Sequence, residues 1–201
     1  QYALLSDKGY FPDSLLDNFL DTESPLGGCL EEIVPGVEAT TGACGHGLSI
    51  AVGVAISLKI KKQREQKVFA IVGDGEHGEG SVWEAAISAA RHNLDNLCII
   101  IDYNKVQCSG SVKDLTNLDP LDEKWKAFGM NVKQVNGHDI SELKKAFSKL
   151  PIKKGKPSVI VCHTIMGKGL NFGEGNAEWH WKGRISPELC EEMIQSINNY
   201  K

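Results

Sequence analysis

The chain has 201 residues, of which 41% are hydrophobic and 24% are charged, and its formal net charge is −4. This composition is ordinary for a globular protein, and the acidic balance gives no support for a nucleic acid partner. No apolar run approaches the length of a membrane span. The six cysteines are widely spaced and include no Cys-x-x-Cys pair, so we expect reduced thiols in a cytoplasmic protein rather than disulfides or a zinc site.

Apolar residues at helical spacing alternate with short, continuous apolar runs from residue 46 onward. In chain order, the pattern predicts a helix over residues 46–62, a strand over 68–72, a helix over 81–92, a strand over 97–101, a helix over 121–128, a strand over 131–135, a helix over 140–150, a strand over 157–162 and a helix over 187–198. We expect Ser81 to cap the helix over 81–92 and Asp139 to open the helix over 140–150.

Continuous apolar strands separated by helices predict an α/β fold, in which a parallel sheet carries helices on both faces. We expect one domain over residues 1–201. The chain opens on the helix-like stretch Gln1-Tyr-Ala-Leu-Leu without an initiator Met, so we also expect that further sequence precedes it.

Polar residues follow each of the four predicted strands. These stretches are Gly73-Asp74-Gly75, Asp102-Tyr103-Asn104, Asn136-Gly137-His138-Asp139 and His163-Thr164. Ligands of parallel sheets bind beyond the carboxyl ends of the strands. The pattern therefore predicts a binding site at this edge of the sheet.

Asp74 lies in an acidic turn that contains no lysine, unlike the usual phosphate-binding loop. Gly73 and Gly75 permit close approach of a ligand to the backbone, and a helix N-terminus follows, which favours an anion. A carboxylate beside a phosphate needs a divalent cation between them, and Mg²⁺ binds in this way through a few protein oxygens. Asn104 offers another oxygen. These residues indicate either a metal-bridged diphosphate or an Asp74 that caps the following turn.

Gly73-Asp74-Gly75, followed after twenty-seven residues by Tyr103-Asn104, resembles the thiamine diphosphate signature of Gly-Asp-Gly with a distal Asn. Longer stretches are similar to transketolases in particular: PGVEATTGACGHGLSIAVGVAISLK, GDGEHGEGSVWEA, DYNKVQ and GKGLNFGEGNAEWH. The resemblance covers nearly the whole chain and implies the diphosphate-binding, or PP-type, domain of the thiamine diphosphate-binding fold.

The resemblance implies a set of ligands. Asp74, Asn104 and the main-chain carbonyl of Val106 would bind Mg²⁺ or Ca²⁺, and the N–H of Gly75 would contact the diphosphate. The implied contacts with thiamine diphosphate come from Gly42, Cys44, Gly45, Gly73, Gly75, Glu76, Asn104 and Val106. Cys44 stands where the family usually has Leu.

Three residues match catalytic positions of the family, and each has a simpler interpretation. Glu79 would relay protons at a subunit interface, although an acid at a helix start is also favoured by the helix dipole. His46 would lie along the cofactor, or else be a loop histidine that faces water. His180 would lie near the diphosphate and the substrate, or else be a surface histidine between tryptophans.

The chain also departs from the family. It contains only the diphosphate-binding half, so the resemblance implies that a separate C-terminal subunit supplies the pyrimidine-binding domain in an α₂β₂ assembly. Cys29 replaces a family histidine that contacts the hydroxyls of the donor, and a thiol is a poorer hydrogen-bond partner. The implied activity is the transfer of a two-carbon unit from a ketose to an aldehyde. Transfer of an acetyl unit from a 2-oxo acid such as pyruvate is the alternative, and a non-catalytic relative also remains open.

Overall fold

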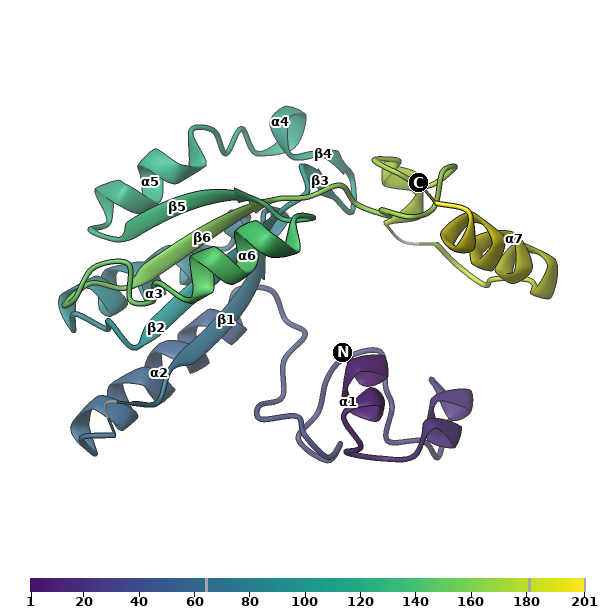
Figure 1. The fold of residues 1–201 in the computed structure, drawn as a ribbon, viewed down its shortest axis with the longest axis horizontal. Coiled ribbons are helices and arrows are strands. Elements are labelled where there is room, and N and C mark those ends of the chain that lie inside the picture. The colour runs from purple at the N-terminus through teal and green to yellow at the C-terminus, as the bar shows by residue number, and fades with distance from the viewer. Residues whose placement is uncertain (64, 181, 201) are drawn as a thin grey trace.

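The computed structural model describes residues 1–63, 65–180 and 182–200, and Figure 1 shows its fold. In chain order, its helices and strands are α1 (Tyr2–Asp7), η1 (Asp13–Asn18), α2 (His46–Ile60), β1 (Val68–Gly73), η2 (Gly75–Gly78), α3 (Gly80–Arg91), β2 (Leu97–Tyr103), β3 (Val106–Gln107), β4 (Gly110–Ser111), α4 (Val112–Leu115), α5 (Leu121–Ala127), β5 (Asn131–Asn136), α6 (Ile140–Phe147), β6 (Ser158–His163), η3 (Ala177–Trp179) and α7 (Pro187–Asn198).

Four strands form one parallel sheet in the order β1-β2-β6-β5, which confirms the predicted α/β fold (Figure 1). Because the chain passes from β2 to β5 before it returns to β6, the direction of winding reverses, and the connecting helices lie on opposite faces of the sheet. Helices α2, α3 and α5 pack on one face and α6 packs on the other. In the register of the sheet, Gly73 pairs with Asp102 and Tyr103 pairs with His163, so the polar residues that follow the strands lie at one edge.

The core follows from the alternation of side chains along these strands. One face of β2 contributes Leu97, Ile99 and Ile101 to a large cluster beneath α2, α3 and α5, with Trp125 at 0% exposure. The opposite face contributes Cys98 to a smaller cluster beneath α6. This two-sided burial explains why the central strands β2 and β6 read as continuous apolar runs.

The structure corrects several details of the predicted elements, including the end of α6, which lies at Phe147 and not at residue 150. Helix α2 ends at Ile60, because Lys62 adopts a left-handed φ of 59°. Glu79 occupies the N-cap position of α3, so Ser81 does not cap that helix. Strand β1 is buried on one face only, since Ile71 is 75% exposed on the side of the sheet that carries α6. Asp139 caps α6 as expected, by accepting hydrogen bonds from the N–H groups of Ser141 and Glu142.

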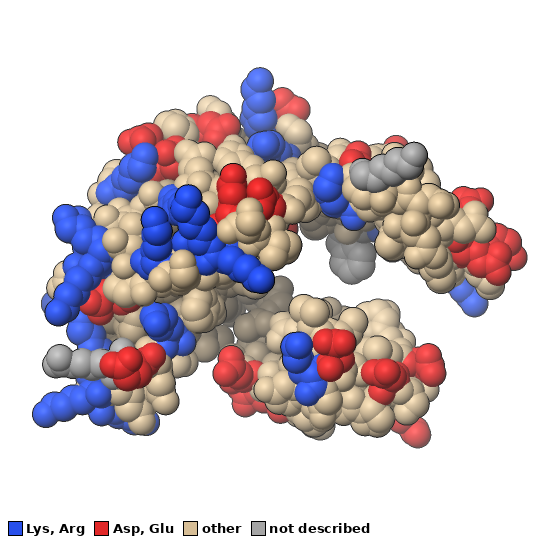
Figure 2. Space-filling view, in the orientation of Figure 1, with Lys and Arg blue, Asp and Glu red and all other residues tan. Residues whose placement is uncertain are grey.

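Two segments extend beyond the carboxyl ends of the strands. Residues 1–45 carry α1 and η1 around a small core of Phe11, Leu26 and Val34. The chain after β6 carries η3 and α7. Figure 2 shows an open gap between these two segments. Among the described residues, no helix combines the length and apolarity needed to cross a bilayer.

Candidate active site

A cleft of about 360 Å³ lies at the carboxyl ends of β1 and β2. It is lined by most of the residues that the sequence singles out, together with three neighbours. The lining residues are Cys44, Gly73, Asp74, Gly75, Glu76, Asn104, Val106, Gln107, Cys108, Ser109 and His180. The fold therefore brings residues from four separate stretches of the chain to one cavity.

Asp74 is the most buried carboxylate of the cleft, at 1% exposure. Its Oδ1 accepts a hydrogen bond of 2.8 Å from the Gly75 N–H, and its Oδ2 accepts one of 2.5 Å from the Lys105 N–H. Burial raises the pKa of this carboxyl to about 6, with a smaller upward contribution from the Asp102 carboxylate, although the two N–H groups oppose the shift. The Asp74 side chain thus links the ends of β1 and β2 and carries a charge that the protein itself compensates poorly.

Asn104 follows β2, and both ends of its side-chain amide are hydrogen-bonded, one to a side chain and the other to the backbone. Its Nδ2 donates to Asp102 Oδ2 at 3.2 Å, while its Oδ1 accepts from the Val106 N–H at 2.8 Å. The Asp102 carboxylate also accepts a hydrogen bond from the Thr164 hydroxyl, which follows β6. An ionised carboxylate only accepts hydrogen bonds, so the NH₂ group of Asn104 must face Asp102. Asp102 thereby fixes the orientation of the amide, with its oxygen pointing away from Asp102. No sequence motif indicated this function of Asp102.

Glu76 holds the loop over residues 42–45 against the end of β1. Its Oε1 accepts from the Gly45 N–H at 2.6 Å, and its Oε2 accepts from the Gly73 N–H at 3.2 Å. The loop packs closely at Gly45, where φ is 84° and an added Cβ would lie 2.2 Å from the Ser81 hydroxyl oxygen. The predicted cofactor residues Gly45 and Gly73 are therefore linked through the carboxylate of Glu76, which accepts a hydrogen bond from each.

The remaining predicted residues divide into two groups. Cys44 and His180 line the cleft, and both are exposed. Although Cys44 is exposed, its partial burial, followed by the Glu76 and Glu79 carboxylates, raises the pKa of its thiol, which disfavours the reactive thiolate.

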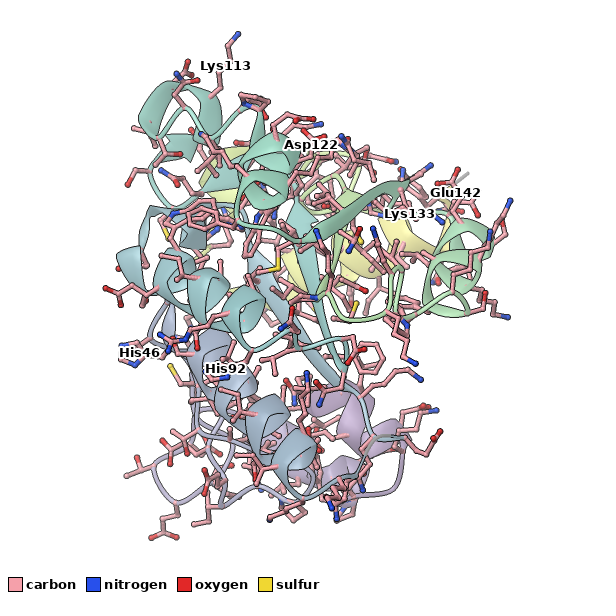
Figure 3. All side chains as sticks on the ribbon, turned by 90° about the vertical axis from the view of Figure 1, so that its left-hand side faces the viewer. His46, His92, Lys113, Asp122, Lys133 and Glu142 are labelled. Atoms are coloured by element: carbon pink, nitrogen blue, oxygen red, sulfur yellow. The ribbon has the colours of Figure 1, made fainter. Side chains whose placement is uncertain are left out.

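The second group comprises Gly42, Gly45, His46 and Glu79, which are not among the residues that line the cleft. His46 opens α2, and its ring projects outward in Figure 3. Glu79 is exposed at the start of α3. The catalytic functions expected of these two residues stay predictions.

The donor set suits a hard cation. Asp74 offers a buried carboxylate, Asn104 an amide oxygen and Val106 a main-chain carbonyl, and oxygen ligands of these kinds are typical of Mg²⁺ and Ca²⁺. A cation would also stabilise the ionised Asp74, whose burial otherwise favours the protonated form. At Gly75, an added Cβ would lie 2.7 Å from the Cβ of Gln107, so the turn beside Asp74 has no room for a side chain.

Most of the chain corresponds to a known domain, because residues 1–192 match the thiamine diphosphate binding domain of transketolases. The chain belongs to the transketolase family. The transketolase resemblance of the sequence is thereby confirmed over most of the chain.

Two relatives are single subunits of transketolases. An apulose-4-phosphate transketolase subunit from Actinobacillus succinogenes is 46% identical over 182 residues, which cover 90% of this chain and 65% of that protein. A 6-deoxy-6-sulfo-D-fructose transketolase subunit from a Clostridium species is 39% identical and covers 96% of this chain and 68% of that protein. The chain thus spans about two thirds of the length of these subunits.

The fold is that of solved transketolases. The crystal structure of the transketolase from Campylobacter jejuni matches with a TM-score of 0.83 and 31% identity, and the match covers 92% of this chain and 30% of that one. The parallel sheet and its helices therefore correspond to the N-terminal part of a much longer transketolase chain.

Proposed function

We propose that this chain is the diphosphate- and cation-binding part of a thiamine diphosphate-dependent, transketolase-like enzyme that transfers a two-carbon unit from a ketose to an aldehyde. The observation that carries the proposal is the convergence of Asp74, Asn104 and Val106 in one cleft at the carboxyl ends of β1 and β2. When bound, thiamine diphosphate supplies the electron sink for breaking and forming carbon–carbon bonds.

The residues of the chain bind and orient the cofactor. Asp74, Asn104 and the Val106 carbonyl would hold Mg²⁺, and the turn at Gly75 would receive the diphosphate beside it. Glu76 keeps the loop over residues 42–45 in place through two backbone hydrogen bonds. His180 lines the cleft and is exposed, and in this proposal it would donate a hydrogen bond to an anionic group.

We infer that the donor is a ketose with a terminal anionic group. The relatives are named for apulose 4-phosphate and for 6-deoxy-6-sulfo-D-fructose, which carry a phosphate and a sulfonate. These names do not favour acetyl transfer from a 2-oxo acid. Cys29 packs against the loop over residues 42–45, since a Cβ added at Gly42 would lie only 2.5 Å from the Cys29 sulfur. This close packing supports a place for Cys29 near the donor.

A second polypeptide is part of the proposal. Several relatives are named as subunits, and such names imply a partner. We propose that the partner carries the pyrimidine-binding domain and that the enzyme is an α₂β₂ assembly in the cytoplasm. All six cysteines are free among the described residues, which agrees with a reducing compartment.

Product analysis of the two-subunit complex tests this function. The complex is given thiamine diphosphate, Mg²⁺ and an aldose phosphate acceptor, with either xylulose 5-phosphate or pyruvate as the donor. We expect a product two carbons longer than the acceptor from the ketose, and none from the complex that carries Asp74→Asn. An acetylated product from pyruvate, without turnover of the ketose, would contradict the proposal.

A further inference from the structure

A buried histidine lies directly beneath the Asp74 turn and has no function in the proposed reaction. His77 is 2% exposed and belongs to η2, between β1 and α3. Its Nδ1 lies 2.8 Å from the Gly73 carbonyl oxygen, and its Nε2 lies 3.1 Å from Nε1 of the fully buried Trp125. An indole N–H only donates and a carbonyl only accepts. The two partners therefore fix a neutral imidazole with its proton on Nδ1.

This histidine helps to fix the peptide bond that precedes Asp74. The carbonyl of that peptide accepts from the His77 ring, and its N–H donates to the Asp102 carbonyl oxygen at 3.2 Å. With both polar ends bonded, the peptide plane is fixed, and with it the direction in which the Asp74 side chain leaves the backbone. An apolar side chain could fill the same space, but it could not orient the Gly73 carbonyl.

A second link reaches the neighbouring strand end. The Tyr103 hydroxyl donates to Asp119 Oδ1, and Tyr103 immediately precedes Asn104 in the chain. A cavity of about 350 Å³ lies beside this ring and is lined by Tyr103, Asp119 and His163, among others. Tyr103 is 7% exposed and packs in the main core, and its hydrogen bond to Asp119 fixes the hydroxyl beside this cavity.

One link ends within α5 and the other ends just before it. Asp119 lies two residues before this helix begins, and Trp125 lies within it. His77 and Trp125 are both buried, so loss of either partner in that link is costly, whereas the Tyr103–Asp119 link is only partly buried. Helix α5 and the residue Asp119 just before it thus contact the ends of both strands that carry the proposed cation ligands.

We propose that α5, together with Asp119 just before it, is a positioning element for the cation site. It orients Asp74 through Trp125, His77 and the Gly73 carbonyl, and it orients the end of β2 before Asn104 through Asp119 and Tyr103. This inference rests on the proposed function and adds positioning residues to it. None of these four side chains is among the residues that line the cofactor cleft.

Calorimetric titration of the two-subunit complex with Mg²⁺, at saturating thiamine diphosphate, tests the inference without measuring turnover. Trp125→Phe removes the N–H donor and keeps an aromatic ring. Loss of a direct outer partner of a metal ligand typically weakens binding about 10- to 100-fold. Trp125 acts through His77 and the Gly73 carbonyl, so we expect a loss at the lower end of this range, about tenfold. Trp83→Phe is the matched control, because Trp83 lies in the same aromatic cluster but donates to the His77 main-chain carbonyl at 3.0 Å and not to the ring.

We expect both tryptophan variants to lower the unfolding temperature, and only Trp125→Phe to weaken Mg²⁺ binding. Equal losses of affinity in the two variants, or an affinity within twofold of wild type for Trp125→Phe, would overturn the inference. Should Trp125→Phe fail to fold, Tyr103→Phe tests the second link, because it removes only the hydroxyl that donates to Asp119. We expect Tyr103→Phe to weaken Mg²⁺ binding as well, and an affinity within twofold of wild type would overturn the inference. If the wild-type complex itself shows no Mg²⁺-dependent binding of thiamine diphosphate, the proposed function fails and not merely the inference.

Discussion

Replacing Asp74 with asparagine should have opposite effects on the empty protein and on the loaded protein. Burial raises the pKa of Asp74 from 3.8 to about 6, so the folded state binds this proton more tightly than the unfolded state does. Stability therefore falls as the pH rises from about 4 to about 6 and then levels off. The shift of about 2 pKa units corresponds to about 3 kcal/mol.

The asparagine variant lacks this pH dependence, because its side chain does not ionise. It also loses one of the two backbone hydrogen bonds to the side chain, from Gly75 or Lys105, at a cost of about 1 kcal/mol. Without metal or cofactor, we therefore expect Asp74→Asn to be more stable than wild type by about 1 to 2 kcal/mol at pH 8. Near pH 4 it should be less stable by about 1 kcal/mol.

Urea unfolding in the presence of EDTA, at pH values between 4 and 8, measures this difference. Asp7→Asn is a suitable control, since that exposed carboxylate forms only a surface pair with Lys8, and its difference from wild type should stay small at every pH. With Mg²⁺ and thiamine diphosphate, the order should reverse at pH 8, because only wild type gains stability from binding. A variant that is destabilised equally at every pH would refute the reasoning.

The other predictions concern the turn and the loop around the site. Asn104→Ala removes a cation ligand and should weaken Mg²⁺ binding at least about tenfold, as measured by calorimetry, with an unchanged affinity counting against the ligand assignment. Gly75→Ala places a Cβ 2.7 Å from the Cβ of Gln107 and should destabilise the protein by about 1 to 3 kcal/mol. Gly78→Ala is the control, because a Cβ there meets nothing within 4 Å, and it should change the unfolding temperature little. Equal losses of stability in the two variants would show that the close approach of Gly75 to Gln107 is unimportant. Glu76→Gln replaces one acceptor oxygen with a donor that faces an N–H group, so the free energy of unfolding should fall by about 1 to 3 kcal/mol. Thiamine diphosphate should also bind more weakly, and unchanged binding would show that the hydrogen bonds of Glu76 to the loop do not support the cofactor site.

Much of the sheet could be predicted from the sequence because parallel strands impose a regular arrangement. The polar residues after β1 and β2 were expected at one edge, and the register of Gly73 with Asp102 places them there. The ends of the helices were less predictable. The prediction extends α6 to residue 150, but the helix ends at Phe147, before Leu150, whose helical conformation is disfavoured by the following Pro151.

The supports of the site could not be predicted, because they depend on contacts between distant residues. The Thr164 hydroxyl, which follows β6, donates a hydrogen bond to Asp102 of the neighbouring strand β2. Trp125, in a helix far from residue 77 in the sequence, donates one to His77. No local spacing marks either pair. His77 in particular is found in an acidic, glycine-rich turn that suggests exposure, and only the packing of α5 reveals its burial.

Binding of thiamine diphosphate to the two-subunit complex, measured by calorimetry with millimolar Mg²⁺ and again with EDTA, tests the central claim most directly. We expect tight binding to wild type only when Mg²⁺ is present, and none to the Asp74→Ala complex under either condition. Equal affinity with and without the cation, or undiminished binding by Asp74→Ala, would contradict a cation site formed by the ends of β1 and β2.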